Sequence, residues 1–326
     1  MTRKARLQSL AKINLDLRVL AKRRDGYHDL RTVFQTVSLA DTIEIEVEPA
    51  RRRAVSIDDA LAIPDNLIIR AAHAALDQMR VAVRVRFRLK KHIPMGGGLG
   101  GGSSDAAAVL LALPVLAGKV IPMERLMEIG QRLGSDVPFF LHGGTQLGCG
   151  AGTELYPQPD VQPKPLLLVT PDVHVATGPA YKALGRGLTF TGSSSSINNF
   201  QAFVRAIGDG RDLVSALALG ANDFEAVVFR QYPQLRKIAA RLRTSSPGVR
   251  MSGSGSTVFA LFESKRDRER ALADLSVDRV LQGCRMMKAE LVGRRAYRKL
   301  WRRQLKDHLA PAKDDVWPPR SRYWQP

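Results

Sequence analysis

Apolar and charged residues alternate over residues 81–89, where arginine occupies positions 84, 86 and 88. The apolar positions are Val81, Val83, Val85, Phe87 and Leu89. A period of two predicts a β-strand with one buried face and one exposed face. The same alternation over Asp41–Glu48 predicts a second such strand, and partial alternation over residues 7–20 predicts a third near the N-terminus.

Helical spacing of apolar residues dominates the rest of the first half. It predicts helices from Pro64 to about Gln78, from Ser103 to about Leu116, and from Pro122 to Leu133. A segment with six glycines at residues 96–102 separates the alternating strand from the second of these helices. Residues 143–152 are broken by glycine, which favours a short strand and a turn.

Four prolines at Pro157–Pro165 indicate a boundary between two domains. Beyond it, strands are expected at 166–170, 249–251, 258–262 and 286–291, and helices at 197–207, 222–230, 233–243 and about 267–275. This mixture predicts an α+β second domain. We therefore expect domains at residues 1–157 and 158–291, followed by a basic C-terminal extension at 292–326. A solvated appendage with a basic helix over residues 294–309 is expected there, and self-association or contact with an anionic surface is the alternative.

The chain has 326 residues and a formal net charge of +19, and residues 285–326 hold twelve Lys or Arg against four Asp or Glu. Such charge attracts nucleic acid through counterion release, or a polyanionic small molecule. No aromatic-rich basic patch or nucleic-acid motif accompanies it, so nucleic acid is not the expected partner. No apolar run reaches the length of a membrane span. Two cysteines are too few for a disulfide framework, and a cytoplasmic protein is expected.

The segment Pro94–Asp105 joins a strand to a helix through the glycines, which predicts a phosphate-binding loop. Glycine lets the backbone approach a ligand, and the N-terminus of the following helix favours an anion. A flexible linker is the plain alternative, but linkers do not usually join a strand to a capped helix. The spacing of Gly96, Gly98 and Gly101 matches a dinucleotide-binding fingerprint, yet the acidic residue needed on the next strand is missing. No Gly-Lys-Ser/Thr follows, so the Walker pattern also fails.

Three segments in the same order resemble the GHMP kinases of small metabolites. They are Ala11–Leu15 (AKINL), the glycine loop, and Met251–Ser256 (MSGSGS). Arg24–His28 (RDGYH) and Leu133–Phe139 (LGSDVPF) narrow the resemblance to a kinase whose substrate carries a cytidine diphosphate. The similarity runs over about residues 7–291.

The resemblance implies a fold and a reaction. The fold would be an N-terminal domain like ribosomal protein S5 domain 2 and a C-terminal ferredoxin-like domain, with the site between them. The reaction would be ATP- and Mg²⁺-dependent phosphorylation of the 2-hydroxyl of a methylerythritol unit, in the non-mevalonate route to isoprenoids. A monomer or a homodimer is compatible with it.

By this resemblance Asp136 is the general base that accepts the proton of the substrate hydroxyl, and Lys12 pairs with it beside the reacting oxygen. Taken alone, Asp136 could equally be a capping or turn residue and Lys12 an ordinary edge-strand lysine. Phosphoryl transfer depends mainly on positioning and charge neutralisation, which suits a carboxylate and an ammonium.

Aromatic residues suit the cytosine, because their faces stack on a base. The resemblance assigns substrate binding to Asn14, Tyr27, His28, Phe34, Thr177 and Tyr181. It assigns the nucleotide to Asn66, Leu67, Pro94, Met95, Gly96, Gly97, Gly98, Leu99, Gly100, Gly101, Gly102, Ser103 and Ser104, with Ser104 also as a metal ligand. Gly253, Ser254 and Gly255 are expected to brace the glycine loop.

Two other functions remain open at this point. One is a GHMP kinase for homoserine, mevalonate or a sugar, against which the Tyr27-His28 pair argues because those substrates carry no base. The other is a non-catalytic nucleic-acid-binding protein with an S5-like fold, which the net charge favours and the combination of Lys12, Asp136 and the glycine loop opposes.

Overall fold

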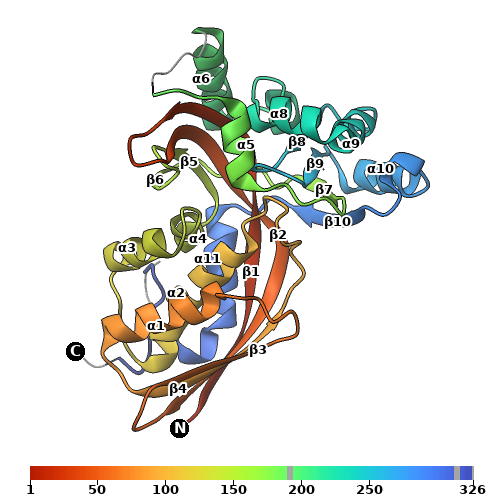
Figure 1. Cartoon of the computed structure of the whole chain (residues 1–326). Coiled ribbons are helices and arrows are strands. Elements are labelled where there is room, and N and C mark those ends of the chain that lie inside the picture. Colours follow the sequence, from red (N-terminus) through yellow and green to blue (C-terminus); the bar gives the residue numbers. More distant parts are fainter. Residues whose placement is uncertain (189–193, 312–315, 325–326) are drawn as a thin grey trace.

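The computed structural model describes residues 1–188, 194–311 and 316–324, which form two β-sheets with helices packed on them (Figure 1). Within these ranges the first sheet has six strands in the order β3–β4–β2–β5–β6, with β1 paired to β2. The strands are β1 (Arg3–Lys22), β2 (His28–Pro49), β3 (Ala54–Asp59), β4 (Val83–Lys90), β5 (Thr145–Cys149) and β6 (Glu154–Pro157). All neighbours are antiparallel except β3 and β4.

The long hairpin of β1 and β2 runs from the lower sheet towards the second half of the molecule (Figure 1). Its register shifts at three places, including Leu10/Lys12 and Asn14/Asp16. β2 begins well before the strand expected at Asp41–Glu48. Its earlier half carries buried Thr32, Gln35 and Thr36 among apolar residues, so both faces are covered and no alternation marks it. The short strands β3 and β6 were also not predicted from the sequence.

Helices α1 (Leu67–Met79), α2 (Gly101–Ala117), α3 (Met123–Leu133) and α4 (Val137–His142) cover the first sheet (Figure 1). The expected helices at 64–78, 103–116 and 122–133 are confirmed as α1, α2 and α3. α2 lies in the middle of the core and is buried on all sides after its first turn. Asn66 caps α1, its side chain accepting a hydrogen bond from the amide of Ile68.

The second sheet has the order β10–β7–β9–β8, and all its neighbours are antiparallel. Its strands are β7 (Pro165–Thr170), β8 (Gly248–Met251), β9 (Val258–Leu261) and β10 (Arg285–Glu290). Its helices are α5 (Thr177–Leu184), α6 (Ser194–Gly208), α7 (Leu213–Ala216), α8 (Asp223–Gln231), α9 (Pro233–Arg243) and α10 (Lys265–Ser276). Numbered along the chain, the four strands lie in the order 4–1–3–2, and helices connect the first strand to the second and the third strand to the fourth. This arrangement is ferredoxin-like. The α+β fold class is therefore confirmed.

The C-terminal extension is not the solvated appendage that we expected. It returns to the first sheet as α11 (Arg294–Gln304), blue in Figure 1, which contacts β1 and, through Tyr297, α4. Tyr297, Trp301 and Leu305 are almost wholly buried and belong to the core of the first half. The expectation failed because Leu300, Leu305 and Leu309 form only a weak pattern among arginines, whereas the buried stripe combines Leu305 with the aromatic Tyr297 and Trp301.

No helix in the described part of the chain is long and apolar enough to cross a membrane.

Candidate active site

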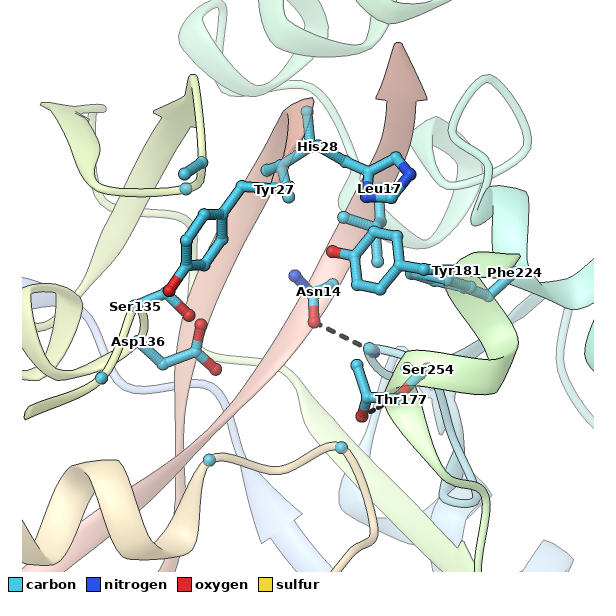
Figure 2. Close-up of a pocket in the computed structure, with 18 of the residues that line it drawn as sticks. Asn14, Leu17, Tyr27, His28, Ser135, Asp136, Thr177, Tyr181, Phe224 and Ser254 are labelled. Atoms are coloured by element: carbon cyan, nitrogen blue, oxygen red, sulfur yellow. Dashed lines mark hydrogen bonds between the residues drawn. The ribbon is translucent and has the colours of Figure 1, made fainter. Parts of the chain in front are cut away.

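A pocket of about 660 Å³ opens between the two halves, and it collects residues from β1, β2, the glycine loop, the start of α4 and helix α5 (Figure 2). Many of the residues predicted from sequence line it. These are Lys12, Asn14, Tyr27, His28, Phe34, Gly98, Gly100, Ser103, Asp136, Thr177 and Tyr181. The structure thus brings together in one cavity residues from sequence segments that lie far apart.

Lys12 and Asp136 face each other at the glycine-loop end of the pocket. Nζ of Lys12 lies 3.6 Å from Oδ2 of Asp136. The lysine is buried, whereas the aspartate side chain keeps 30% of its surface exposed towards the cavity. Burial lowers the pKa of Lys12, and the carboxylate of Asp136 opposes that shift. A cation with little water around it acts more strongly on a neighbouring negative charge.

Asn14 ties this pair to the second half of the chain. Its Oδ1 accepts hydrogen bonds from Nζ of Lys12 at 2.7 Å and from the amide of Gly253 at 3.0 Å. Its Nδ2 donates to the hydroxyl of Thr32 at 2.7 Å. Both polar atoms of the Asn14 side chain are therefore hydrogen-bonded to protein groups. Asn14 thus orients Lys12 and fixes the segment Met251–Ser256 (the third motif) against β1. Figure 2 shows the bond from Gly253 as a dashed line.

The glycine loop packs against the third motif so tightly that a side chain could not fit. A β-carbon on Gly98 would lie 2.1 Å from the carbonyl oxygen of Ser252, and its φ of +75° is one that glycine adopts readily. The hydroxyl of Ser252 donates to the carbonyl of Gly98 at 2.9 Å. The amide of Thr257 donates a hydrogen bond to the carbonyl of Gly97 at 3.2 Å. The third motif braces the loop, as expected, and the backbone of Gly98 and Gly100 stays open to the pocket.

The two serines after the loop have different surroundings. Ser104 is buried, and its hydroxyl donates to the carbonyl of Leu10 at 2.7 Å. It is therefore turned away from the cavity, which corrects the assignment of Ser104 as metal ligand. Ser103 lines the pocket at the N-terminus of α2 instead. No group of three or more His, Cys, Asp or Glu that could hold a metal is found among the described residues.

Asp105 belongs to a buried ionic cluster behind the loop. Its carboxylate accepts hydrogen bonds from the hydroxyl of Ser9 at 2.5 Å and from Nζ of Lys91 at 2.9 Å. Lys91 also pairs with Asp41, whose other oxygen accepts from the amide of Ile93. Burial raises the pKa of Asp105 to about 7, although Lys91 opposes that shift. Asp105 therefore anchors the start of α2 to β1 and the end of β4 and does not face the pocket.

The far end of the pocket is aromatic. The rings of His28 and Tyr181 are stacked with centroids 4.6 Å apart, and Phe224 meets Tyr181 edge-on at 4.8 Å. Burial lowers the pKa of His28 and raises that of Tyr181 to about 12, so both rings are neutral at pH 7. Tyr27 is 63% exposed and extends on the opposite side, towards Ser135 and Asp136 (Figure 2).

Phe34 has a different position from the other aromatic residues. It is buried, its ring lies 5.0 Å from that of Phe139, and Nζ of Lys12 stands 5.6 Å above it. Its faces are therefore already in contact with protein groups, and it supports Lys12 from below. Thr177 lies at the other wall, where its hydroxyl is hydrogen-bonded to that of Ser254 at 2.9 Å (Figure 2).

Several residues expected to bind nucleotide lie outside this pocket. They are Asn66, Leu67, Pro94, Met95, Gly96, Gly97, Leu99, Gly101, Gly102 and Ser104. Leu99 is buried, Met95 is exposed, and Leu67 packs against the start of α2, 3.6 Å from where a β-carbon of Gly102 would be. Gly101 and Gly102 already belong to the first turn of α2.

Sequence reasoning missed Asn222. It is buried, and its Nδ2 donates to the carbonyls of Met251 at 2.7 Å and of Gly253 at 2.8 Å. Its Oδ1 caps α8 by accepting from the amide of Phe224. The spacing of Asn222 and Glu225 is that of a capping pair and predicts the helix start, but not the contact with the third motif. Lys22 and Lys182, which also line the pocket, carried no local signal.

Two family models match this chain. The GHMP kinases N terminal domain matches residues 66–144, and the GHMP kinases C terminal model matches residues 199–277. The first span includes the glycine loop and Asp136, so the class defined by the fold and the pocket is that of the GHMP kinases.

Relatives narrow this class. A 4-diphosphocytidyl-2-C-methyl-D-erythritol kinase of Solibacter usitatus is 50% identical over 327 residues, which cover 99% of this chain and 98% of the relative. One from Geobacter metallireducens is 38% identical over 276 residues, 83% of this chain and 93% of the relative. A crystal structure of 4-(cytidine 5'-diphospho)-2C-methyl-D-erythritol kinase is 34% identical, covers 90% of this chain and 100% of that chain, and has a TM-score of 0.71. The chain belongs to the family of these GHMP kinases.

More distant structures share the fold alone. A homoserine kinase from Cytophaga hutchinsonii has a TM-score of 0.69 at 16% identity and covers 89% of this chain and 95% of that chain.

Proposed function

We propose that this chain transfers the γ-phosphoryl group of ATP to the 2-hydroxyl of 4-diphosphocytidyl-2-C-methyl-D-erythritol, a step of the non-mevalonate route to isoprenoid precursors. The observation that carries the proposal is the position of Lys12 and Asp136, 3.6 Å apart in the same cavity as the glycine loop and the stacked His28 and Tyr181. Residues 1–157 and 158–291 serve as the two walls of this cleft.

The reacting hydroxyl lies between Lys12 and Asp136. Asp136 accepts its proton, and the ammonium of Lys12 stabilises the negative charge that develops on the oxygen. That oxygen forms a bond to the γ-phosphorus while the bond from phosphorus to the leaving ADP oxygen breaks. The protein's main contribution is to align these groups, because the transferred phosphoryl requires little covalent chemistry from side chains.

The glycine loop and the N-terminus of α2 hold the triphosphate through backbone amides. Gly98 and Gly100 present their main chain to the cavity, and Ser103 adds a hydroxyl there. A Mg²⁺ ion bound to phosphate oxygens keeps several water ligands and needs few from the protein. Ser103 is a hydroxyl-bearing side chain of this part of the pocket that fits such an ion. When bound, Mg²⁺ neutralises charge on the phosphates.

The aromatic end of the pocket takes the cytosine. Tyr27 and the stacked pair of His28 and Tyr181 offer flat faces and polar edges, and Lys22 and Lys182 supply positive charge for a diphosphate. Homoserine, mevalonate and simple sugars have neither a base nor a diphosphate, so they would leave this end unfilled. This favours the cytidine substrate over the substrates of other GHMP kinases.

The nucleic-acid alternative is weakened by the pairing of surface arginines. Arg86 lies 3.3 Å from Glu46 and 2.6 Å from Glu48, and Arg88 lies 3.1 Å from Asp58. Much of the arginine row on β4 is thus neutralised by carboxylates on adjacent strands. We place the enzyme in the cytoplasm as a monomer or a homodimer, where its two cysteines are free thiols.

The test is a phosphate-transfer assay with ATP, Mg²⁺ and 4-diphosphocytidyl-2-C-methyl-D-erythritol, run beside mevalonate and homoserine. We expect kcat/KM for the cytidine substrate to exceed the others by several orders of magnitude. Comparable rates with mevalonate or homoserine would assign the chain to a different substrate. ATP-independent, salt-sensitive binding of nucleic acid without any turnover would support the non-catalytic alternative.

A further inference from the structure

The short helix α4 connects the proposed base to the C-terminal extension. α4 spans Val137–His142, and Asp136 is the residue that immediately precedes it. A helix of this length has few internal hydrogen bonds, and its last carbonyls lack partners within it. The direction of such a helix therefore depends on what binds its two ends.

The extension supplies hydrogen bonds to those last carbonyls. The hydroxyl of Tyr297 donates to the carbonyl of Phe140 at 2.5 Å, and Nε1 of Trp317 donates to the carbonyl of Leu141 at 2.8 Å. The two rings also meet edge-on, with centroids 6.4 Å apart. Both side chains thus bind the same turn of α4.

Tyr297 also fills the space at the end of the helix. It is 2% exposed, and a β-carbon on Gly143 would lie 2.5 Å from its ring. Gly143 follows α4 directly and has a φ of +63°. Burial raises the pKa of Tyr297, so its hydroxyl stays protonated and remains a donor at all pH values at which the protein would be assayed.

The other side of α4 contacts the catalytic groups. The ring of Phe140 lies beside Gly100 of the glycine loop, 2.8 Å from where a β-carbon on that glycine would be. The same hypothetical β-carbon would lie 3.1 Å from the side chain of Lys12. Phe139 packs on Phe34, above which Lys12 stands. A shift of α4 would therefore change the separation of Asp136 from both Lys12 and the loop.

We propose that Tyr297 and Trp317 are positioning residues, whose hydrogen bonds to the last turn of α4 hold Asp136 at its working distance from Lys12. This inference rests on the proposed role of Asp136 as general base. It gives the extension a part in the reaction although none of its residues at 292–311 and 316–324 lines the pocket.

The alternative is that the extension only completes the core and stabilises the fold. Ser321 offers a matched control, because it lies in the same extension and its hydroxyl donates to the carbonyl of Val115 at 2.7 Å. That bond binds the C-terminal end of α2, at the opposite end of the helix from the glycine loop. Ser321→Ala removes this bond, and the one that the hydroxyl accepts from the amide of Tyr323 at 3.2 Å, without touching α4.

The experiment compares Tyr297→Phe, Trp317→Phe and Ser321→Ala in the full chain. Tyr297→Phe keeps the six-membered ring and loses the donor to α4. Trp317→Phe keeps an aromatic ring and loses the donor together with part of the indole, over which the guanidinium of Arg298 lies. We expect kcat to fall about tenfold in each and up to about 100-fold in the double variant, because small misplacements of catalytic groups are costly. KM for both substrates should stay within about twofold, and Ser321→Ala should keep the kcat of the unmodified protein. Folding of each variant is checked by its melting temperature.

A double-mutant cycle separates positioning from stability. Positioning a base has no effect once the base is absent, so Tyr297→Phe should lower kcat little further when added to Asp136→Asn. The same holds for Trp317→Phe, which tests the inference independently should Tyr297→Phe fold poorly. Folded variants with the kcat of Ser321→Ala, or losses that simply add to that of Asp136→Asn, would overturn the inference. An unmodified protein without turnover would instead refute the proposed function.

Discussion

Nζ of Lys12 lies 3.6 Å from Oδ2 of Asp136, which is within ion-pair range and longer than a hydrogen bond. The pair is thus close enough for both groups to contact one substrate oxygen, and it is not closed by a direct bond. Catalytic hydrogen bonds in proteins without substrate are often long and tighten only in the reacting complex.

Replacing the carboxylate tests its role directly. Asp136→Ala should lower kcat by about 10²–10⁴-fold, because the hydroxyl loses its proton acceptor. The dissociation constant for ATP, measured by calorimetry, should change little, since backbone amides of the loop hold the phosphates. Asp274→Asn, an exposed position on α10, serves as control and should retain full activity. Near-normal turnover of Asp136→Ala would remove the base assignment.

The close packing of the glycine loop can be tested by comparing a Gly→Ala substitution within it to the same substitution at a control position. Gly98→Ala would place a methyl group 2.1 Å from the carbonyl oxygen of Ser252 at a φ of +75°, so the loop must move and ATP affinity should fall at least tenfold. Gly208→Ala, at the end of α6 with open space around the new β-carbon, is the control and should bind ATP normally. ATP titration of both variants checks this. Equal affinities would show that the close packing at Gly98 does not shape the phosphate site.

The pKa of Lys12 predicts how activity depends on pH. Lys12 acts as a cation, so kcat falls when pH rises through its pKa. Burial lowers this pKa from its ordinary value of 10.5, and therefore the alkaline fall should begin below pH 10.5. A profile of log kcat against pH, with circular dichroism recorded at each pH to verify folding, measures it. A profile that stays flat up to pH 10.5 would contradict the assignment of Lys12.

Stacking at the aromatic end can be tested at Tyr181. Tyr181→Leu removes the ring that stacks on His28 and should raise KM for the cytidine substrate at least tenfold, with KM for ATP nearly unchanged. Tyr181→Phe keeps the ring and should bind substrate almost normally. The exposed Tyr27 is tested in the same way, since Tyr27→Ala should also raise KM for the cytidine substrate more than for ATP. If KM for both substrates rose equally, the aromatic residues would have no selective role.

Trp301 measures what the extension contributes to the fold. It is 1% exposed within the first core, so Trp301→Ala should lower the free energy of unfolding by about 3–5 kcal/mol. Removing residues 292–326 should be more damaging, because it exposes the core surface that α11 covers. Urea unfolding of the point variant gives the value. A truncated chain with unchanged stability would show that this packing is dispensable.

Most strands and helices could be predicted because they carry a local signal, such as the arginine–apolar alternation of β4 and the glycines before α2. The roles of Lys12 and Asp136 carry no such signal and were inferred only from the resemblance to the GHMP kinases. Orientation could not be predicted in this way. Ser103 and Ser104 are neighbours of the same type, and only the packing of α2 against β1 decides which one faces the pocket.

Long-range partners were also beyond the sequence. Asn222 has the spacing of a helix cap, yet its bonds to Met251 and Gly253 depend on how α8 meets β8. Tyr297 and Trp301 lie in an arginine-rich segment that suggests a solvated helix. They are buried because they pack on the apolar core of the first half. The sequence of residues 285–326 alone gives no information about that core.

The return of the extension to the first sheet has a consequence for biosynthesis. Gln304 accepts a hydrogen bond from the amide of Gln8, and the guanidinium of Arg3 lies over the ring of Tyr323, so β1 is bound by residues made about 300 positions later. Domains of growing chains ordinarily fold in the order in which they leave the ribosome. Here part of the apolar surface of the leading half stays uncovered until the residues around Trp301 and Tyr323 have been made.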